Sequence, residues 1–177
     1  SPKDGLLYGA QIVGKEGVDK RIDVLSAVIS RGGSIYDLAD FEQAYAPPYS
    51  SAKDPVNIIG FVAENIFQQK VFFADWEKLN EPASFDIIVD VRSAQEYAAG
   101  HVAGAINIPL DEIRRRLTEL PKDKTIFLYC QQGLRGYLAQ RILLQNGFNK
   151  VANLAGGYRL YEICEAEKKL LPVVEQE

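Results

Sequence analysis

The sequence predicts an α/β fold, a parallel sheet with helices on both faces, preceded by a partial α+β region. From about Lys70 onward, short apolar runs alternate with segments of helical periodicity. The run at 85–90 is almost entirely apolar, which is typical of a parallel strand buried on both sides. Short loops join these segments, and alternation of this kind favours parallel strands with crossover helices.

Five strands and their connecting helices are expected in this larger part of the chain. The predicted strands cover residues 71–73, 85–90, 105–108, 125–129 and 151–154. Helical spacing predicts helices at 93–99, 110–120 and 134–146, and a closing helix that contains Tyr161 and Cys164. Gly147 is expected just past the end of the third of these helices.

The first 69 residues follow another pattern. Helices are predicted at 18–29 and 35–44, and a third begins at Pro55 with Asp54 as its N-cap. The apolar run from Leu6 to Val13 is the one candidate strand, and a lone strand leaves its backbone edges unpaired. We therefore divide the chain into residues 1–69, part of a larger domain, and residues 70–177.

Composition excludes several classes of function. The net charge of −4 gives no reason to expect nucleic acid or an anionic membrane as a partner. No apolar run approaches the ~18 residues of a membrane span, and no signal peptide is evident. Two cysteines and one histidine argue against a disulfide framework and a metal site, so we expect a cytoplasmic protein without metal.

The stretch "FLYCQQGLRG" places Cys130 at the end of a predicted strand, just before a helix. Sites in parallel sheets form at this end of the strands. The N–H groups of Gln131, Gln132 and Gly133 can turn toward one point, and the helix that starts near Leu134 adds its positive dipole. This environment favours a thiolate, and Arg135 can brace the loop or hold an anion. An ordinary buried cysteine is the simpler alternative.

The C-x-x-G-x-R spacing of Cys130 to Arg135 resembles the active loop of the rhodanese (sulfurtransferase) family. The stretch 90–110 and the "NLAGGY" turn at 153–158 are similar to other signatures of that family. The resemblance covers about residues 70–172 and implies that Cys130 accepts a sulfane sulfur as a persulfide. Asp90 and Arg92 are expected to support the loop, whereas His101 and Cys164 are expected to be structural.

Two alternatives remain for this module. Cysteine phosphatases share the fold but use a C-x5-R loop, and the shorter loop here suits sulfur better than a tetrahedral phosphate. A rhodanese-like module can also serve as a non-catalytic interaction or dimer-covering domain, although the intact loop favours catalysis.

Residues 1–69 resemble the C-terminal dimerisation domain of FAD-dependent pyridine nucleotide-disulfide oxidoreductases, in particular the coenzyme A-disulfide reductases. The resemblance rests on "YGAQIVGKEG" and "YAPPYSSAKDPVN". It implies a homodimer, and makes Tyr45 and then Tyr49 the candidate contacts to a coenzyme A sulfur species. FAD and NAD(P)H are expected in the full-length enzyme, and no cofactor is expected on this segment alone.

Together the two resemblances imply the C-terminal part of a coenzyme A-disulfide reductase–rhodanese fusion. Cys130 would take sulfur from polysulfide, a persulfide or thiosulfate and deliver it to a flavin site for reduction. A coenzyme A-type thiol is the expected small-molecule partner.

Overall fold

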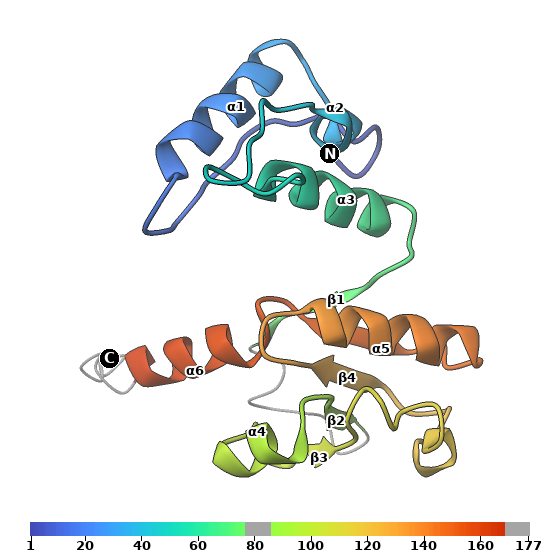
Figure 1. Cartoon of the computed structure of the whole chain (residues 1–177). Coiled ribbons are helices and arrows are strands. Elements are labelled where there is room, and N and C mark those ends of the chain that lie inside the picture. The colour runs from blue at the N-terminus through green and yellow to red at the C-terminus, as the bar shows by residue number, and fades with distance from the viewer. Residues whose placement is uncertain (77–85, 169–177) are drawn as a thin grey trace, which may run out of the picture. The chain divides into compact units, whose positions relative to one another are not determined.

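The computed structural model describes residues 1–76 and 86–168 and divides the chain into two compact units, Ser1–Lys70 and Val71–Glu177. We call them unit 1 and unit 2 and describe each by itself (Figure 1). In the described residues, no helix is long and apolar enough to cross a bilayer.

Unit 1 is built from three helices: α1 (Val18–Ser30), α2 (Ile35–Asp40) and α3 (Pro55–Phe67). Its core is a small apolar cluster of Leu25, Val28, Leu38 and Val56. The side chain of Asp54 accepts a hydrogen bond from the Val56 N–H, as the N-cap prediction requires. The predicted helix starts therefore agree with the structure.

Two predictions in unit 1 are wrong. Residues 7–13 form no strand: Leu6 makes an isolated bridge to Ser34, and Val13 is 91% exposed. The Leu7 N–H donates to the Gly33 carbonyl at 3.0 Å, next to the bridge, and the pairing does not extend into a ladder. The second helix ends at Asp40 instead of Ala44, because the side chain of Asn57 bonds the carbonyls of Leu38 and Phe41 at its end.

Unit 2 contains one parallel five-stranded sheet with the order β1-β5-β4-β2-β3, which confirms the α/β prediction. The strands are β1 (Phe73–Ala74), β2 (Ile87–Asp90), β3 (Ile106–Asn107), β4 (Ile126–Tyr129) and β5 (Val151–Leu154). The first strand begins two residues later and ends one residue later than expected, and the predicted strand start at Phe85 lies outside the described residues.

Apolar side chains cover both faces of this sheet, because neighbouring strand residues point to opposite sides. On one face Leu128 packs with residues of α5 (Leu134–Gln145), including Ala139 and Leu143. On the other face Phe127 and Tyr129 pack with Tyr97 of α4 (Ala94–Ala99) and Tyr158 of α6 (Gly157–Lys168). Central strand β4 is therefore buried along its whole length.

The predicted helix at 110–120 is also wrong. This segment forms successive turns and one 3-10 helix, Leu117–Glu119, with N–H groups bonded three residues back, as from Ile113 to Leu110. Its apolar positions Ile113 and Leu120 are buried, so packing against the sheet holds a tighter backbone than the periodicity predicts.

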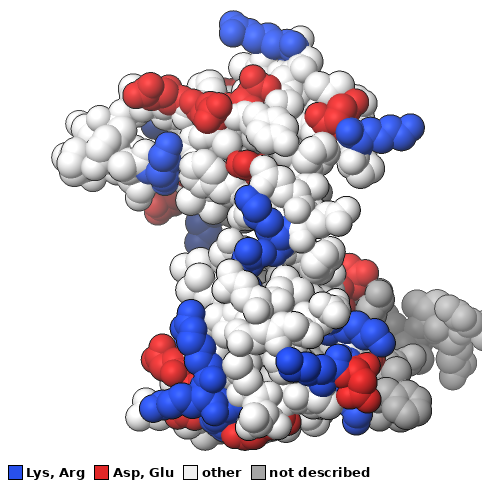
Figure 2. All heavy atoms as spheres, turned by 90° about the vertical axis from the view of Figure 1, so that its right-hand side faces the viewer, with Lys and Arg blue, Asp and Glu red and all other residues white. Residues whose placement is uncertain are grey.

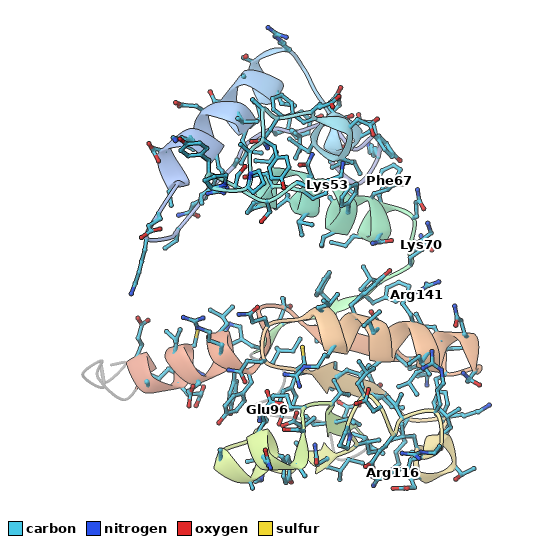
Figure 3. All side chains as sticks on the ribbon, in the orientation of Figure 1. Lys53, Phe67, Lys70, Glu96, Arg116 and Arg141 are labelled. Atoms are coloured by element: carbon cyan, nitrogen blue, oxygen red, sulfur yellow. The ribbon has the colours of Figure 1, made fainter. Side chains whose placement is uncertain are left out.

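Charged side chains of both signs are mixed on the face that Figure 2 displays. Arg116, labelled in Figure 3, forms ion pairs with Glu112 and Glu119 on its own segment. These pairs neutralise one another locally, in keeping with a solvated face.

Helices α2 and α3 approach so closely that only glycine fits at position 60. A Cβ there would lie 2.8 Å from the Cα of Ala39 and collide with its backbone nitrogen. Alanine is normally better than glycine in a helix by about 1 kcal/mol. In Gly60→Ala we expect the reverse, a loss of about 1–3 kcal/mol, because the two helices must separate.

Urea unfolding followed by far-UV circular dichroism measures this effect. Gly9→Ala is the matched control, since a Cβ at Gly9 meets nothing within 4 Å. Equal stabilities of Gly60→Ala and Gly9→Ala would contradict the close approach.

Candidate active site

Cys130 lies at the carboxyl end of β4, the middle strand of the sheet, where the chain turns toward α5. Only 2% of its surface is exposed. Its thiol Sγ accepts a hydrogen bond from the N–H of Gly133 at 3.1 Å. Gly133 has φ = 145°, a conformation that residues with a Cβ rarely adopt, so glycine is what lets this N–H face the sulfur.

The start of α6 holds the other side of the loop. The N–H groups of Tyr158 and Arg159 donate to the carbonyls of Cys130 (2.8 Å) and Gln131 (3.2 Å). Gly157 makes this approach possible, because a Cβ there would stand 2.6 Å from the Cys130 carbonyl oxygen. Both carbonyls thus point to α6, and the loop N–H that the structure places on the sulfur is that of Gly133.

Arg135 braces the loop through an ion pair, and its side chain is about a third exposed. Its two terminal nitrogens each donate at 2.7 Å to one carboxylate oxygen of Glu96 on α4, which is labelled in Figure 3. The Arg135 guanidinium lowers the pKa of Glu96 from its ordinary 4.5 to about 2. The Glu96 carboxylate in turn raises the pKa of Arg135, so both groups stay charged.

Asp90 and Arg92 form a buried ion pair at the end of β2, beside the loop. The Arg92 guanidinium donates to Asp90 at 2.7 Å, to the Gln131 side chain at 3.1 Å and to the Gly100 carbonyl at 2.6 Å. It also lies 4.0 Å from the ring centroid of Tyr158. Burial alone would lower the pKa of Arg92, but its bonds to Asp90 raise it.

The remaining sequence candidates have distinct surroundings. Gln132 and Leu134 are exposed at the loop surface, Leu134 to 70%. Tyr45 and Tyr49 belong to unit 1 and are also exposed; Tyr45 lines a polar cavity of about 320 Å³ with Lys53 (labelled in Figure 3).

His101 and Cys164 offer no chemistry beside Cys130 in the described structure. The His101 ring stacks on Tyr97 at 3.8 Å and its Nδ1 lies 3.0 Å from the Tyr97 carbonyl oxygen. Cys164 is half-buried on α6. Both positions agree with the structural roles expected from the sequence.

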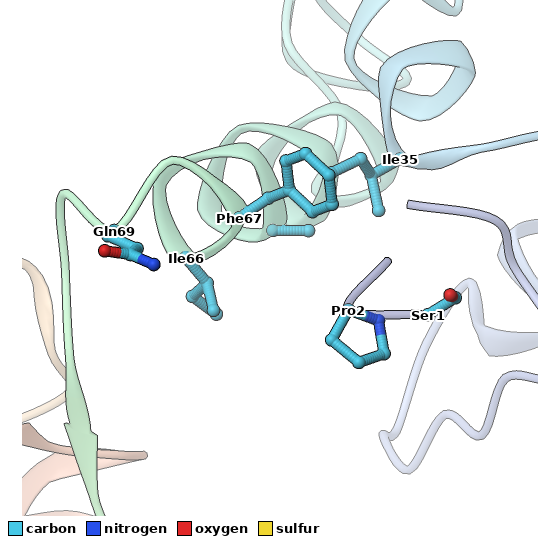
Figure 4. A pocket seen from close by; sticks show the side chains of 7 residues that line it. Ser1, Pro2, Ile35, Ile66, Phe67 and Gln69 are labelled. Atoms are coloured by element: carbon cyan, nitrogen blue, oxygen red, sulfur yellow. The ribbon is translucent and has the colours of Figure 1, made fainter. Parts of the chain in front are cut away.

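A second cavity on unit 1, of about 400 Å³, has a mostly apolar lining that includes Ile35, Ile66 and Phe67 (Figure 4). Its polar lining residues are Ser1 and Gln69, and neither Cys130 nor any Asp, Glu, His, Lys or Arg lines it. It therefore offers no catalytic chemistry of its own.

Sequence reasoning missed three residues that shape the loop: Glu96, Gly157 and Asn153. Glu96 stands in the stretch 90–110, but nothing in the sequence pairs it with Arg135 across 39 positions. Gly157 and Asn153 belong to the "NLAGGY" turn, but the sequence does not show what either residue contacts. The signal that could reveal Gly157 is the double glycine directly after a predicted strand.

A family model described as a rhodanese-like domain matches residues 75–164. The chain belongs to the rhodanese-like family. Over 71 residues it is 39% identical to a sulfurtransferase of Allochromatium vinosum, covering 40% of this chain and 66% of that one. Over 58 residues it is 53% identical to a coenzyme A disulfide reductase of Staphylococcus epidermidis, covering 33% and 13%.

Two solved structures extend the similarity. Reduced Bacillus anthracis CoADR-RHD is 46% identical with a TM-score of 0.80, covering 87% of this chain and 28% of that one. A NAD-dependent persulfide reductase from A. fulgidus is 42% identical with a TM-score of 0.72, covering 82% and 26%. Each of these structures matches a larger part of this rhodanese-family chain than unit 2 occupies. The similarity therefore includes residues of unit 1. The sequence resemblance to reductase–rhodanese fusions is thereby confirmed, although the chain spans only about a quarter of either structure.

The Glu96–Arg135 pair predicts a specific dependence of stability on pH. Because the pKa of Glu96 is lower in the folded state than its ordinary 4.5, the pair stabilises the fold above that pH. This contribution is lost as the pH falls toward about 2. Since both side chains are about a third exposed, we expect Glu96→Gln to cost about 1 kcal/mol or less at pH 7.

Thermal unfolding of wild type and Glu96→Gln between pH 7 and pH 2 measures this difference. The amide oxygen of glutamine can still accept the bond from the Ser93 N–H, so the helix cap is kept, whereas the charge and one of the two bonds from Arg135 are removed. A difference that stays constant across this range would contradict the assignment.

Proposed function

We propose that unit 2 carries sulfane sulfur on Cys130 as a persulfide. The observation that carries this proposal is the Gly133 N–H that donates to the Cys130 sulfur at 3.1 Å. A preorganised donor stabilises the Cys130 thiolate, which is the form that accepts a sulfane sulfur. Membership of the rhodanese-like family and similarity to a sulfurtransferase support it.

The chemistry is a sulfur transfer in two steps. The Cys130 thiolate attacks the outer sulfur of a polysulfide, persulfide or thiosulfate; the new S–S bond forms as the donor's bond to that sulfur breaks. The rest of the donor leaves with the electron pair: a thiolate from a persulfide, a polysulfide anion one sulfur shorter from a polysulfide, and sulfite from thiosulfate. A coenzyme A-type thiolate that attacks the outer sulfur then removes it and restores the Cys130 thiolate.

The state of Arg135 favours sulfur transfer over phosphate chemistry. Both terminal nitrogens of its guanidinium are bound to Glu96, so a tetrahedral phosphate would have to compete with this carboxylate. The loop between Cys130 and Arg135 is also one residue shorter than a C-x5-R loop. We therefore propose a sulfurtransferase in preference to a phosphatase.

We further propose that the acceptor is an FAD- and NAD(P)H-dependent reductase of coenzyme A disulfide, coenzyme A persulfide or polysulfide, in a homodimeric, cytoplasmic enzyme. Similarity to a coenzyme A disulfide reductase and to a NAD-dependent persulfide reductase supports this context. Unit 1 would be part of the dimerisation domain, with Tyr45 and Tyr49 near a coenzyme A sulfur species. The 177 residues contain no G-x-G pair of the kind that holds a dinucleotide, so they do not fit these cofactors and no step here runs through them.

Cys130→Ser tests the persulfide. After treatment with inorganic polysulfide, mass spectrometry of the wild type should show one added sulfur atom on the Cys130 peptide. Sulfur transfer to cyanide should fall by at least roughly 100-fold in Cys130→Ser, because the attacking atom is gone.

Cys164→Ser is the matched control, being the other cysteine of the chain, and it should keep both properties. An unmodified wild-type Cys130 would overturn the proposal and favour a non-catalytic interaction module. In a protein that also contains the reductase domains, undiminished polysulfide reduction by Cys130→Ser would exclude the delivery role.

A further inference from the structure

A buried asparagine on β5 contacts the cysteine loop from inside the sheet. Asn153 has 1% of its surface exposed and lies beside Leu128 of β4 in the strand register. Its side-chain Nδ2 donates to the carbonyl oxygen of Gly133 at 3.1 Å. Gly133 is the residue whose N–H donates to the Cys130 sulfur, so one residue connects Asn153 to the thiol.

The fold does not need this hydrogen bond. The Gly133 carbonyl already accepts the N–H of Tyr137 at 2.8 Å in the first turn of α5. In the described structure the other amide atom, Asn153 Oδ1, is buried with no hydrogen-bond partner. A buried polar atom without a partner is destabilising, so Asn153 is a poor choice for stability alone.

The Asn153 side chain also requires a glycine in the neighbouring helix α5. Gly136 lies inside α5, where glycine is unfavourable relative to alanine. A Cβ at position 136 would stand 2.9 Å from Asn153 Cγ and collide with Oδ1. Gly136 thus provides the room that the Asn153 amide occupies.

We propose that Asn153 is a positioning residue for Cys130. Its Nδ2 holds the carbonyl of Gly133 and so limits rotation of this flexible glycine, which keeps the Gly133 N–H aimed at the sulfur. The thiolate and, resting on the function proposed above, the persulfide are then stabilised by a donor that need not reorient. Leucine at 153 would fill the space without holding Gly133, and alanine would leave the space empty.

The charged groups around the loop are separate from this contact. Arg135 and Glu96 pair across the start of α5, and Arg92 and Asp90 pair at the end of β2. Among the described residues, the Asn153 side chain is hydrogen-bonded to Gly133 and to none of these four. A substitution at 153 therefore changes the donor geometry and leaves the charges in place.

Alkylation of Cys130 by iodoacetamide, followed by peptide mass spectrometry from pH 5 to 10, tests the inference. In Asn153→Leu, which matches the side chain in size, we expect the midpoint of the rate profile to move up by about half to one pH unit. At a fixed pH below the midpoint this is roughly a three- to tenfold slower reaction. The unfolding midpoint in urea should change little, because an unpartnered atom is removed as well.

Gln140→Leu is the matched control, a second buried amide of the same region. Its Nε2 donates to the carbonyls of Phe72 and Val151, both at 2.8 Å, and serves the packing of α5 on the sheet. This variant should lose stability and keep the wild-type alkylation profile. An unchanged profile in Asn153→Leu, or an equal shift in Gln140→Leu, would overturn the inference.

Gly136→Ala supplies a test that survives if Asn153→Leu folds poorly. In the wild-type background the added Cβ displaces the Asn153 amide and should slow alkylation to a similar degree. In the Asn153→Ala background the same change has no amide to displace, and should leave the rate unaltered. Additive effects of the two substitutions would contradict the inference.

The two measurements distinguish a failure of the positioning role of Asn153 from a failure of the proposed sulfur-carrier function. Alkylation reports the thiol without any sulfur donor, whereas polysulfide treatment reports persulfide formation. A shifted profile with no sulfur on Cys130 would retain the positioning role of Asn153 and reject the carrier. If Cys130 takes up sulfur but wild type and Asn153→Leu have identical alkylation profiles, the carrier function would be retained and the positioning role of Asn153 rejected.

Discussion

The buried contacts of Arg92 are the constraint on which the site depends. One guanidinium joins the end of β2 through Asp90, the cysteine loop through Gln131 and the residue after α4 through the Gly100 carbonyl. Taking a charge out of water is costly, and it is tolerated here because nearly every donor of the group is used. The Arg92 guanidinium therefore holds the loop firmly, because moving it away would leave the buried Asp90 carboxylate without its ion-pair partner.

Around this centre the loop is held from three sides. The Arg135–Glu96 pair joins it to α4, the backbone of α6 takes the carbonyls of Cys130 and Gln131, and Asn153 reaches Gly133 from β5. All these contacts fix main-chain direction, and main-chain N–H groups do not titrate. The sulfur thus faces a donor whose charge state is the same at any pH at which the protein is folded.

Local signals account for what the sequence could predict. Strands β4 and β5, the N-cap at Asp54 and the cysteine loop were all encoded within a few neighbouring residues. The errors arose where distant residues decide: Asn57 ends α2, and sheet packing converts 110–120 to turns. Glu96 and Asn153 were missed for the same reason, since their partners lie 39 and 20 positions away.

The enclosure of Cys130 has a consequence for what can reach it. With 2% of the residue exposed, the protein covers almost all of Cys130. A sulfur atom added to the thiol would lie about 2 Å from Sγ, the length of an S–S bond. Under the proposed function, an acceptor therefore has to reach the added sulfur and not the buried Sγ.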